Sequence, residues 1–132
     1  KVNHPVYYGG PALTNVVGVL HSTDFILTST NTLTEDKVGF TLDRKMLEVI
    51  ARGQGPKNML ITLGMANWST GQLEEELEHP RNPAMSWLVM DYDEKFVFGQ
   101  LDDDKPDDLW ENCVNQAIRN KTQEITSKIF ED

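Results

Sequence analysis

Six residues stand out as a candidate binding cleft, because they offer ligand-binding groups that a hydrophobic core does not need. Trp68 and Gln72 flank the start of a short acidic helix, where an indole and an amide can form a shelf for a small ligand. His21 ends an apolar strand, and histidine titrates near neutral pH. The turn Gly9-Gly10-Pro11 offers backbone N–H groups to an anion. We expect Gly9, Gly10, Pro11, His21, Trp68 and Gln72 to converge on one surface cleft.

Each of these residues also has a purely structural interpretation. The turn lacks the length and the lysine of a phosphate-binding loop, and Gly and Pro punctuate chains for conformational reasons alone. A histidine at the end of a strand can simply cap it with a hydrogen bond. Trp68 can serve as a hydrophobic lid over a sheet. These alternatives remain open at the level of sequence.

Other reactive side chains do not form a recognisable centre. His4, His21 and His79 are far apart in sequence, and the single cysteine, Cys113, lies on the apolar stripe of an expected helix, where a thiol usually packs as a small hydrophobe. The aspartates around residues 102–108 do not have the spacing of a calcium-binding loop. We therefore expect no catalytic residue, no metal and no cofactor.

Length and charge narrow the classes of protein further. A chain of 132 residues is one domain, residues 1–132, and 12 basic against 21 acidic residues give a net charge of −9. That charge opposes binding to nucleic acid and to anionic membranes. No apolar run approaches the ~20 residues of a membrane span and there is no second cysteine, so we expect a cytoplasmic protein, and we expect no leader peptide.

The pattern of apolar residues predicts several strands interrupted irregularly by helices. Because the helices do not alternate regularly with strands, the pattern favours an α+β fold with a mixed or antiparallel sheet and about three peripheral helices. Helices are expected over 46–51, after the S-x-x-Q capping motif at 69–72, and from 106 to 118, with Gly53 ending the first. Strands are expected at 6–8, 16–20, 25–28, 38–42, 58–63, 87–90 and 96–98, and the tail near 125–129 could add a last edge strand.

Several motifs together resemble the AlgH/YqgE family of bacterial proteins. Val19 replaces the usual phenylalanine of the second motif, Asp43 stands in place of a serine, and Lys45 in place of an aspartate. The resemblance runs from Tyr8 to about Ala117 and rests on Tyr8-Gly9-Gly10-Pro11, on Val17 to His21, on Leu47 to Pro56, on Leu63 to Glu76, and on Trp87 and Trp110.

The resemblance implies a compact α+β fold with a bifurcated, barrel-like sheet. Its members are mostly uncharacterised, a transcriptional-regulator label attaches to the AlgH name, and no catalytic residue can be carried over. Family members carry further strands before the first motif. Their absence here implies an unpaired strand edge at 16–20 or 58–63. We expect a homodimer through such an edge, or a tail, 124–130, folded back over it.

These observations favour a cytosolic domain that binds a small molecule or an unidentified partner protein, with a regulatory role. A DNA-binding transcriptional regulator is the alternative, which the charge of −9 disfavours because phosphate repels a net anion. An enzyme that uses His21 with Gln72 is the least supported class.

Overall fold

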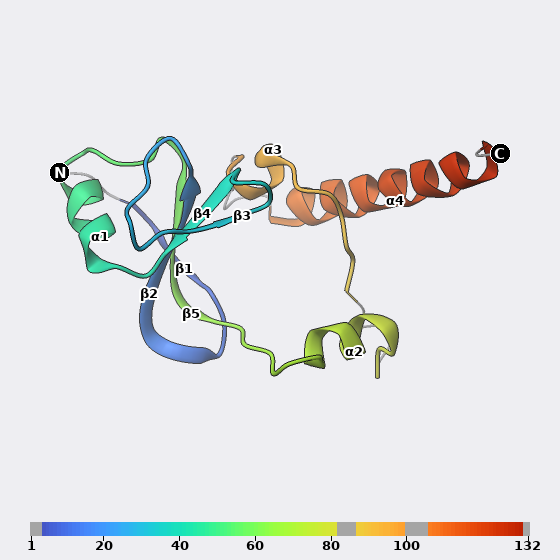
Figure 1. Ribbon diagram of the computed structural model, residues 1–132, viewed down its shortest axis with the longest axis horizontal. Helices are drawn as coiled ribbons and strands as arrows, with labels where there is room; N and C mark the ends of the chain where they lie inside the picture. Colours follow the sequence, from blue (N-terminus) through green and yellow to red (C-terminus); the bar gives the residue numbers. More distant parts are fainter. Residues whose placement is uncertain (1–3, 82–86, 100–105, 131–132) are drawn as a thin grey trace. The chain divides into compact units, whose positions relative to one another are not determined.

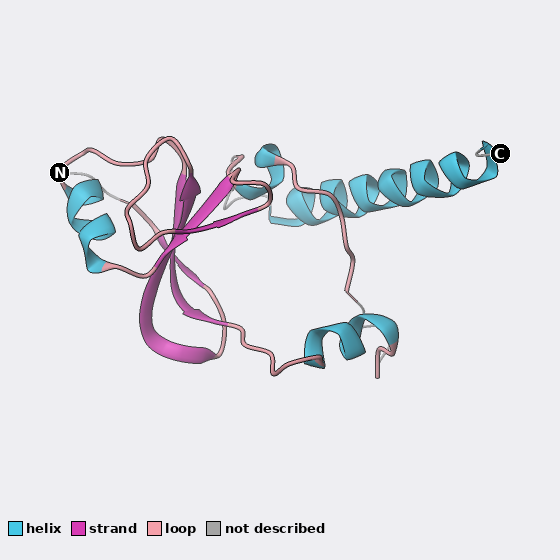
Figure 2. Ribbon diagram, in the orientation of Figure 1, coloured by secondary structure: helices cyan, strands magenta, loops and turns pink. Residues whose placement is uncertain are grey.

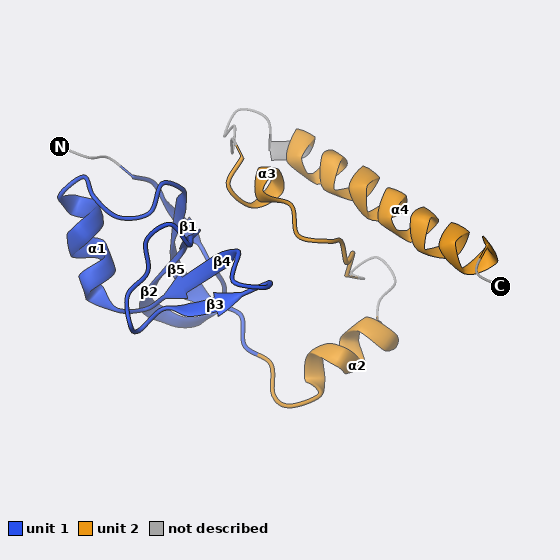
Figure 3. Cartoon of the chain, turned by 45° about the horizontal axis from the view of Figure 1, so that its top comes forward, with its two compact units in different colours: residues 1–67 blue, residues 68–132 orange. Residues whose placement is uncertain are grey.

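The computed structural model describes residues 4–81, 87–99 and 106–130, in two compact units that cover residues 1–67 and 68–132 (Figure 3). Each unit is described by itself. The first holds β1 (Val6–Tyr8), β2 (Ala12–Ser22), β3 (Asn31–Leu33), β4 (Val38–Thr41), α1 (Arg44–Ala51) and β5 (Met59–Met65). The second holds α2 (Gln72–Glu78), α3 (Glu94–Val97) and α4 (Pro106–Phe130). The single-domain boundaries stay a prediction.

The five strands form one mixed sheet in the order β1-β5-β2-β4-β3 (Figures 1 and 2). β1 pairs with β5 in parallel, and the other three pairs are antiparallel. The predicted α+β fold with a mixed sheet is therefore confirmed. The barrel-like detail is wrong, because β1 and β3 end the strand order and, in the part of the chain that the structure describes, they do not pair with each other to close the sheet.

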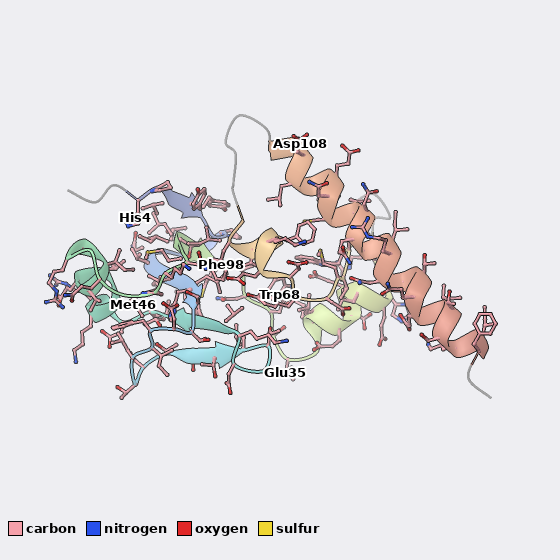
Figure 4. All side chains as sticks on the ribbon, turned by 90° about the horizontal axis from the view of Figure 1, so that it is seen from above. His4, Glu35, Met46, Trp68, Phe98 and Asp108 are labelled. Carbon is pink, nitrogen blue, oxygen red and sulfur yellow. The ribbon has the colours of Figure 1, made fainter. Side chains whose placement is uncertain are left out.

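The core lies between the sheet and α1. Side chains alternate across a strand, so Val17, Val19 and His21 of β2 share one face. Met46 and Ile50 of α1 pack on that face, and Met46 is completely buried (Figure 4). Val19 and Ile61 face each other across β2 and β5 and complete the buried cluster.

α1 begins and ends where local sequence signals place it. The side chain of Asp43 caps the helix by accepting a hydrogen bond from the backbone N–H of Lys45 at 2.9 Å. Gly53 adopts the left-handed conformation, with φ 75°, and its N–H donates to the carbonyl of Ile50 at 2.9 Å. The glycine predicted to end this helix is confirmed.

The strand predicted at 25–28 is wrong. The backbone N–H of Leu27 donates to the Thr30 hydroxyl at 2.9 Å, and the N–H of Thr30 donates back to the Leu27 carbonyl at 3.0 Å. This local turn uses the backbone groups that a strand would offer to a neighbour. The short strand β3 forms instead at Asn31–Leu33, between the strands expected at 25–28 and 38–42.

The two strands expected to have an unpaired edge both lie inside the sheet. β2, which contains residues 16–20, lies between β5 and β4, and β5 lies between β1 and β2. Both edge strands have three residues, which limits the backbone that another strand could pair with. Among the described residues, β4 pairs with β2 at Val19–Ser22 and β1 pairs with β5 at Ile61–Leu63, and the expected homodimer stays a prediction.

The second unit is helical wherever the structure describes regular elements. Residues 87–90 have no regular structure, and the strand predicted at 96–98 is replaced by α3, which Asp93 caps through the N–H of Lys95 at 2.9 Å. α4 continues through 125–129, because no Gly or Pro interrupts residues 107–130. The aspartates at 102–104 lie outside the described residues. No described helix is long and apolar enough to cross a membrane.

Candidate ligand-binding site

Two tryptophans share one carboxylate in the second unit. The indole N–H groups of Trp68 and Trp87 both donate to Oε2 of Glu76, at 3.3 and 3.1 Å. The two rings meet edge to face, with centroids 5.7 Å apart and an interplanar angle of 64°. One half-buried carboxylate therefore fixes the positions of two large aromatic rings.

The start of α2 positions this carboxylate. Gln72 Oε1 accepts hydrogen bonds from the backbone N–H of Ser69 at 3.0 Å and from its hydroxyl at 3.1 Å. This is one arm of the predicted capping box, although the helix itself begins at Gln72 after a left-handed Gly71. Because residues four apart lie on the same helix face, Gln72 and Glu76 project to the same side of α2.

A cavity of about 640 Å³ opens beside these groups. Its size lies in the range of sites that hold small molecules. The lining carries two carboxylates against one guanidinium, so its charge is net negative when His79 is neutral. The cavity is lined by Gln72, Glu75, Glu76, His79, Pro80, Arg81 and Trp87.

The carboxylate of Glu76 can accept further hydrogen bonds, and the site therefore suits a hydrogen-bond donor that carries positive charge. Both indole bonds end on Oε2 of Glu76, and a carboxylate can accept about four hydrogen bonds through its two oxygens. Trp87 is 50% exposed and lines the cavity, so part of an electron-rich ring is open to a ligand. A cation is attracted to both the carboxylate and the ring face.

Two of the six residues predicted to form a cleft meet here. Gln72 lines the cavity, and Trp68 is bonded to the same glutamate as Trp87. Sequence reasoning missed Glu76 and Trp87 as site residues. The four-residue spacing from Gln72 could have singled out Glu76 from the other glutamates of α2, whereas the pairing of Trp68 with Trp87 has no local signal.

His21 is completely buried in the first unit, inside a chain of hydrogen bonds. Its Nδ1–H donates to the Ser22 carbonyl at 2.8 Å, so in the neutral ring Nε2 must accept the hydrogen bond from the Thr41 hydroxyl at 2.8 Å. Thr41 then accepts from the Thr30 hydroxyl at 2.8 Å, and Thr30 from the N–H of Leu27. Every group in this chain has a partner when the imidazole is neutral.

The Gly9-Gly10-Pro11 turn lies at the opposite end of β5 from His21. The N–H of Gly9 donates to the Leu63 carbonyl at 2.8 Å, and a Cβ at Gly9 would stand 2.2 Å from the Gly64 carbonyl oxygen. His21 pairs instead with Met59, where β5 begins. The glycines thus allow the backbone to pass close to β5, and the structure does not bring the turn and His21 together.

The predicted cleft as a whole stays a prediction, because its six residues divide between the two units. Within the first unit, His21 presents no accessible side-chain surface. Among the described residues, no three His, Cys, Asp or Glu side chains gather as a metal site requires.

Asp24 and Asp43 have lowered pKa values, and both carboxylates stabilise the fold of the first unit. The hydroxyl of Ser22 and the backbone N–H of Lys57 donate to Asp24 and lower its pKa. The backbone N–H of Lys45 and the hydroxyl of Ser29 lower the pKa of Asp43 in the same way. Both carboxylates therefore fix loops or caps in the first unit, and neither lines the cavity.

Comparison with known proteins now identifies the class. The model of the AlgH-like family matches residues 2–121 of this chain, and the chain therefore belongs to this family. It is 39% identical over 102 residues to a UPF0301 protein of Bradyrhizobium sp. (strain BTAi1), which covers 77% of this chain and 45% of that protein. A UPF0301 protein of Rickettsia akari is 38% identical over 112 residues, covering 83% and 53%.

A solved structure supports the same assignment. The solution structure of the AlgH protein from Pseudomonas aeruginosa, also described as UPF0301, matches with a TM-score of 0.57 at 35% identity. The match covers 70% of this chain and 46% of that protein. The chain thus spans about half the length of the relatives that it matches.

Proposed function

We propose that this chain is a ligand-binding domain without catalytic activity, and that its site takes a small organic cation bearing an amine or guanidinium group. The observation that carries the proposal is the carboxylate of Glu76, which receives two indole N–H groups at the wall of a cavity of about 640 Å³. Two rings held by one carboxylate are already oriented before a ligand arrives, which reduces the entropy lost on binding.

Charge selects the class of ligand. Glu75 and Glu76 outweigh Arg81 in the lining, and Glu74 and Glu78 lie on the same short helix. An anion would meet repulsion from these carboxylates, whereas an ammonium or guanidinium gains a charge-assisted hydrogen bond. The same charges disfavour a nucleic-acid phosphate at this site.

The lining also favours binding over catalysis. Its described side chains include no Ser, Thr, Cys or Lys that could act as a nucleophile beside His79. The buried imidazole of His21 donates to a backbone carbonyl and accepts from Thr41, so it has no open nitrogen with which to act as a base. A regulatory role would follow from ligand occupancy and not from chemistry performed on the ligand.

The test is a titration of the chain with agmatine and putrescine, followed by tryptophan fluorescence in a Trp110→Phe background and by calorimetry. We expect saturable binding, and no binding of a diol of the same chain length. Glu76→Gln should weaken binding about tenfold or more, since a hydrogen bond to a charged group contributes roughly 1.5–3 kcal/mol. Glu78→Gln is the matched control, because it removes the same charge from the same helix outside the lining.

Two results would overturn the proposal. Equal weakening in Glu76→Gln and Glu78→Gln would show that the amines respond only to the acidity of α2. Failure to saturate with either amine at millimolar concentration would exclude this class of ligand. A Glu76→Gln variant that loses its helical circular dichroism would be replaced by Trp87→Leu, which keeps the charge and removes the ring.

A further inference from the structure

The cavity beside Glu76 is walled by one face of α2 and by the segment that follows this helix. Four of its lining residues follow one another at intervals of three, one and three positions, which places them on a single helix face. They are Gln72, Glu75, Glu76 and His79. Arg81 lines the same cavity and comes two residues after His79, the C-cap of α2. The wall therefore combines two carboxylates from the helix with one guanidinium from the chain beyond it.

Two of these three charged side chains are unpaired. Among residues 4–81, 87–99 and 106–130, the Glu75 carboxylate and the Arg81 guanidinium form no ion pair and no side-chain hydrogen bond, either with each other or with another residue. Glu76 holds the two indole N–H groups and can accept further bonds. The cavity thus offers two places for a cation and one place for an anion.

We propose that the ligand of this site is a basic α-amino acid of the arginine, ornithine or lysine type, an inference that rests on the ligand-binding function proposed above. Such a molecule carries two cations and one carboxylate, which complement two carboxylates and one guanidinium. The side-chain cation binds Glu76 and the ring of Trp87. The α-ammonium group binds Glu75, and the α-carboxylate binds Arg81.

The two glutamates can hold two cations of one ligand because their side chains diverge. Consecutive positions on an α-helix are turned by about 100° from each other, so the carboxylates of Glu75 and Glu76 occupy separate places in the wall. The two cations of a basic amino acid are likewise separated by the length of its side chain. A ligand with a single cation leaves one of these carboxylates without a partner.

Arg81 distinguishes an amino acid from a simple diamine. An amine without a carboxylate brings positive charge into a cavity that already holds the Arg81 guanidinium, and the two repel each other. Arginine presents its N–H groups in a planar fork that matches a carboxylate through two parallel hydrogen bonds. A carboxylate on the ligand therefore converts this repulsion into an attraction.

The first test compares ligands that differ by one charged group, using calorimetry on the 132-residue chain. Agmatine is arginine without its carboxylate, and 5-guanidinopentanoate is arginine without its α-ammonium group. We expect arginine to bind about tenfold more tightly than either, the size of effect expected for one charge-assisted hydrogen bond.

The second test assigns each charged group of the ligand to a residue. Arg81→Gln should weaken the binding of arginine about tenfold and should leave the binding of agmatine unchanged or tighter. Arg119→Gln is the matched control, because Arg119 donates to Gln116 on α4 and does not line the cavity. Glu75→Gln should weaken arginine but not 5-guanidinopentanoate, and Glu74→Gln is its control on the same helix, outside the described lining.

Failure of this inference and failure of the proposed function give different results. If neither agmatine nor arginine binds, the cation site itself is refuted, and this inference with it. If agmatine binds the wild-type chain as tightly as arginine does, the site takes simple cations and only the amino-acid inference is overturned. The same holds if Arg81→Gln weakens both ligands equally, which would give Arg81 a purely structural role. The ligand comparison on the wild-type chain stays decisive even if a variant loses its helical circular dichroism.

Discussion

Gly39 lies directly opposite His21 in the β2–β4 pair, and a Cβ at residue 39 would stand 2.5 Å from Cε1 of the imidazole. The imidazole therefore fills the space that any other side chain at residue 39 would need. The buried ring owes its hydrogen-bonded position to a residue with no side chain on the neighbouring strand.

Gly39→Ala should destabilise the fold by about 1–3 kcal/mol, the usual cost of overpacking a core. Urea unfolding followed by circular dichroism measures the change. In a His21→Ala background the same substitution should cost much less, because the atom that it meets is gone. Equal costs in the two backgrounds would contradict the steric explanation.

Thr41→Val should leave His21 Nε2 without its hydrogen-bond donor, at a cost of about 1–3 kcal/mol in the free energy of unfolding. Thr41→Ser retains the hydroxyl and should cost less. Nitrogen-15 spectra of the imidazole give an independent reading, in which we expect the wild-type ring to carry its proton on Nδ1. A proton on Nε2 would reverse the direction that we assign to the chain of hydroxyls.

Gly64→Ala should be more destabilising than Gly53→Ala, although both glycines are left-handed, with φ 78° and 75°. A Cβ at Gly64 would lie 2.4 Å from the Gly10 carbonyl oxygen, whereas a Cβ at Gly53 would meet nothing within 4 Å. The difference between the two variants in urea unfolding isolates the close approach of the backbone from conformational strain. Equal losses of stability in the two variants would mean that conformational strain alone, and not the close approach to Gly10, accounts for the effect of Gly64→Ala.

Asp43 should make stability depend on acid pH. Hydrogen bonds from Lys45 N–H and the Ser29 hydroxyl lower its folded-state pKa, so its contribution is present above the unfolded-state pKa of about 3.9 and is lost as pH falls through the lower folded-state value. Asp43→Asn should therefore lower the melting temperature at neutral pH and change it little in strong acid. Glu35→Gln serves as the control, and an identical pH profile in both variants would contradict the assignment.

The parts of the fold that local signals govern could be predicted from the sequence. α1 follows from its apolar spacing and from Gly53 and Pro56, and β1, β4 and the interior strand at 59–63 follow from β-branched runs and breakers. The strand expected at 25–28 failed because Thr30 forms a turn with Leu27. The last edge strand suggested near 125–129 is replaced by the continuation of α4, because no Gly or Pro separates these residues from the helix.

The candidate site was predictable only where its residues are neighbours in sequence. Trp68 and Gln72 are four residues apart, and their association with a helix start was visible in the capping motif. The contribution of Trp87 depends on its contact with Trp68, nineteen residues earlier in the sequence, and local patterns do not encode such distant contacts. His21 looked reactive by type, but its partners Thr30 and Thr41 come from other segments and give it a structural role.

The insertion of β5 between β1 and β2 sets an order for assembly as the chain leaves the ribosome. β2, β4 and β3 can associate once residue 41 has emerged, because they are neighbours in the sheet and close in sequence. β1 is made before them, yet its pairing of Val6 with Ile61 has to wait for a strand synthesised more than fifty residues later. Of these five strands, the first in sequence is thus the last that the sheet can accept.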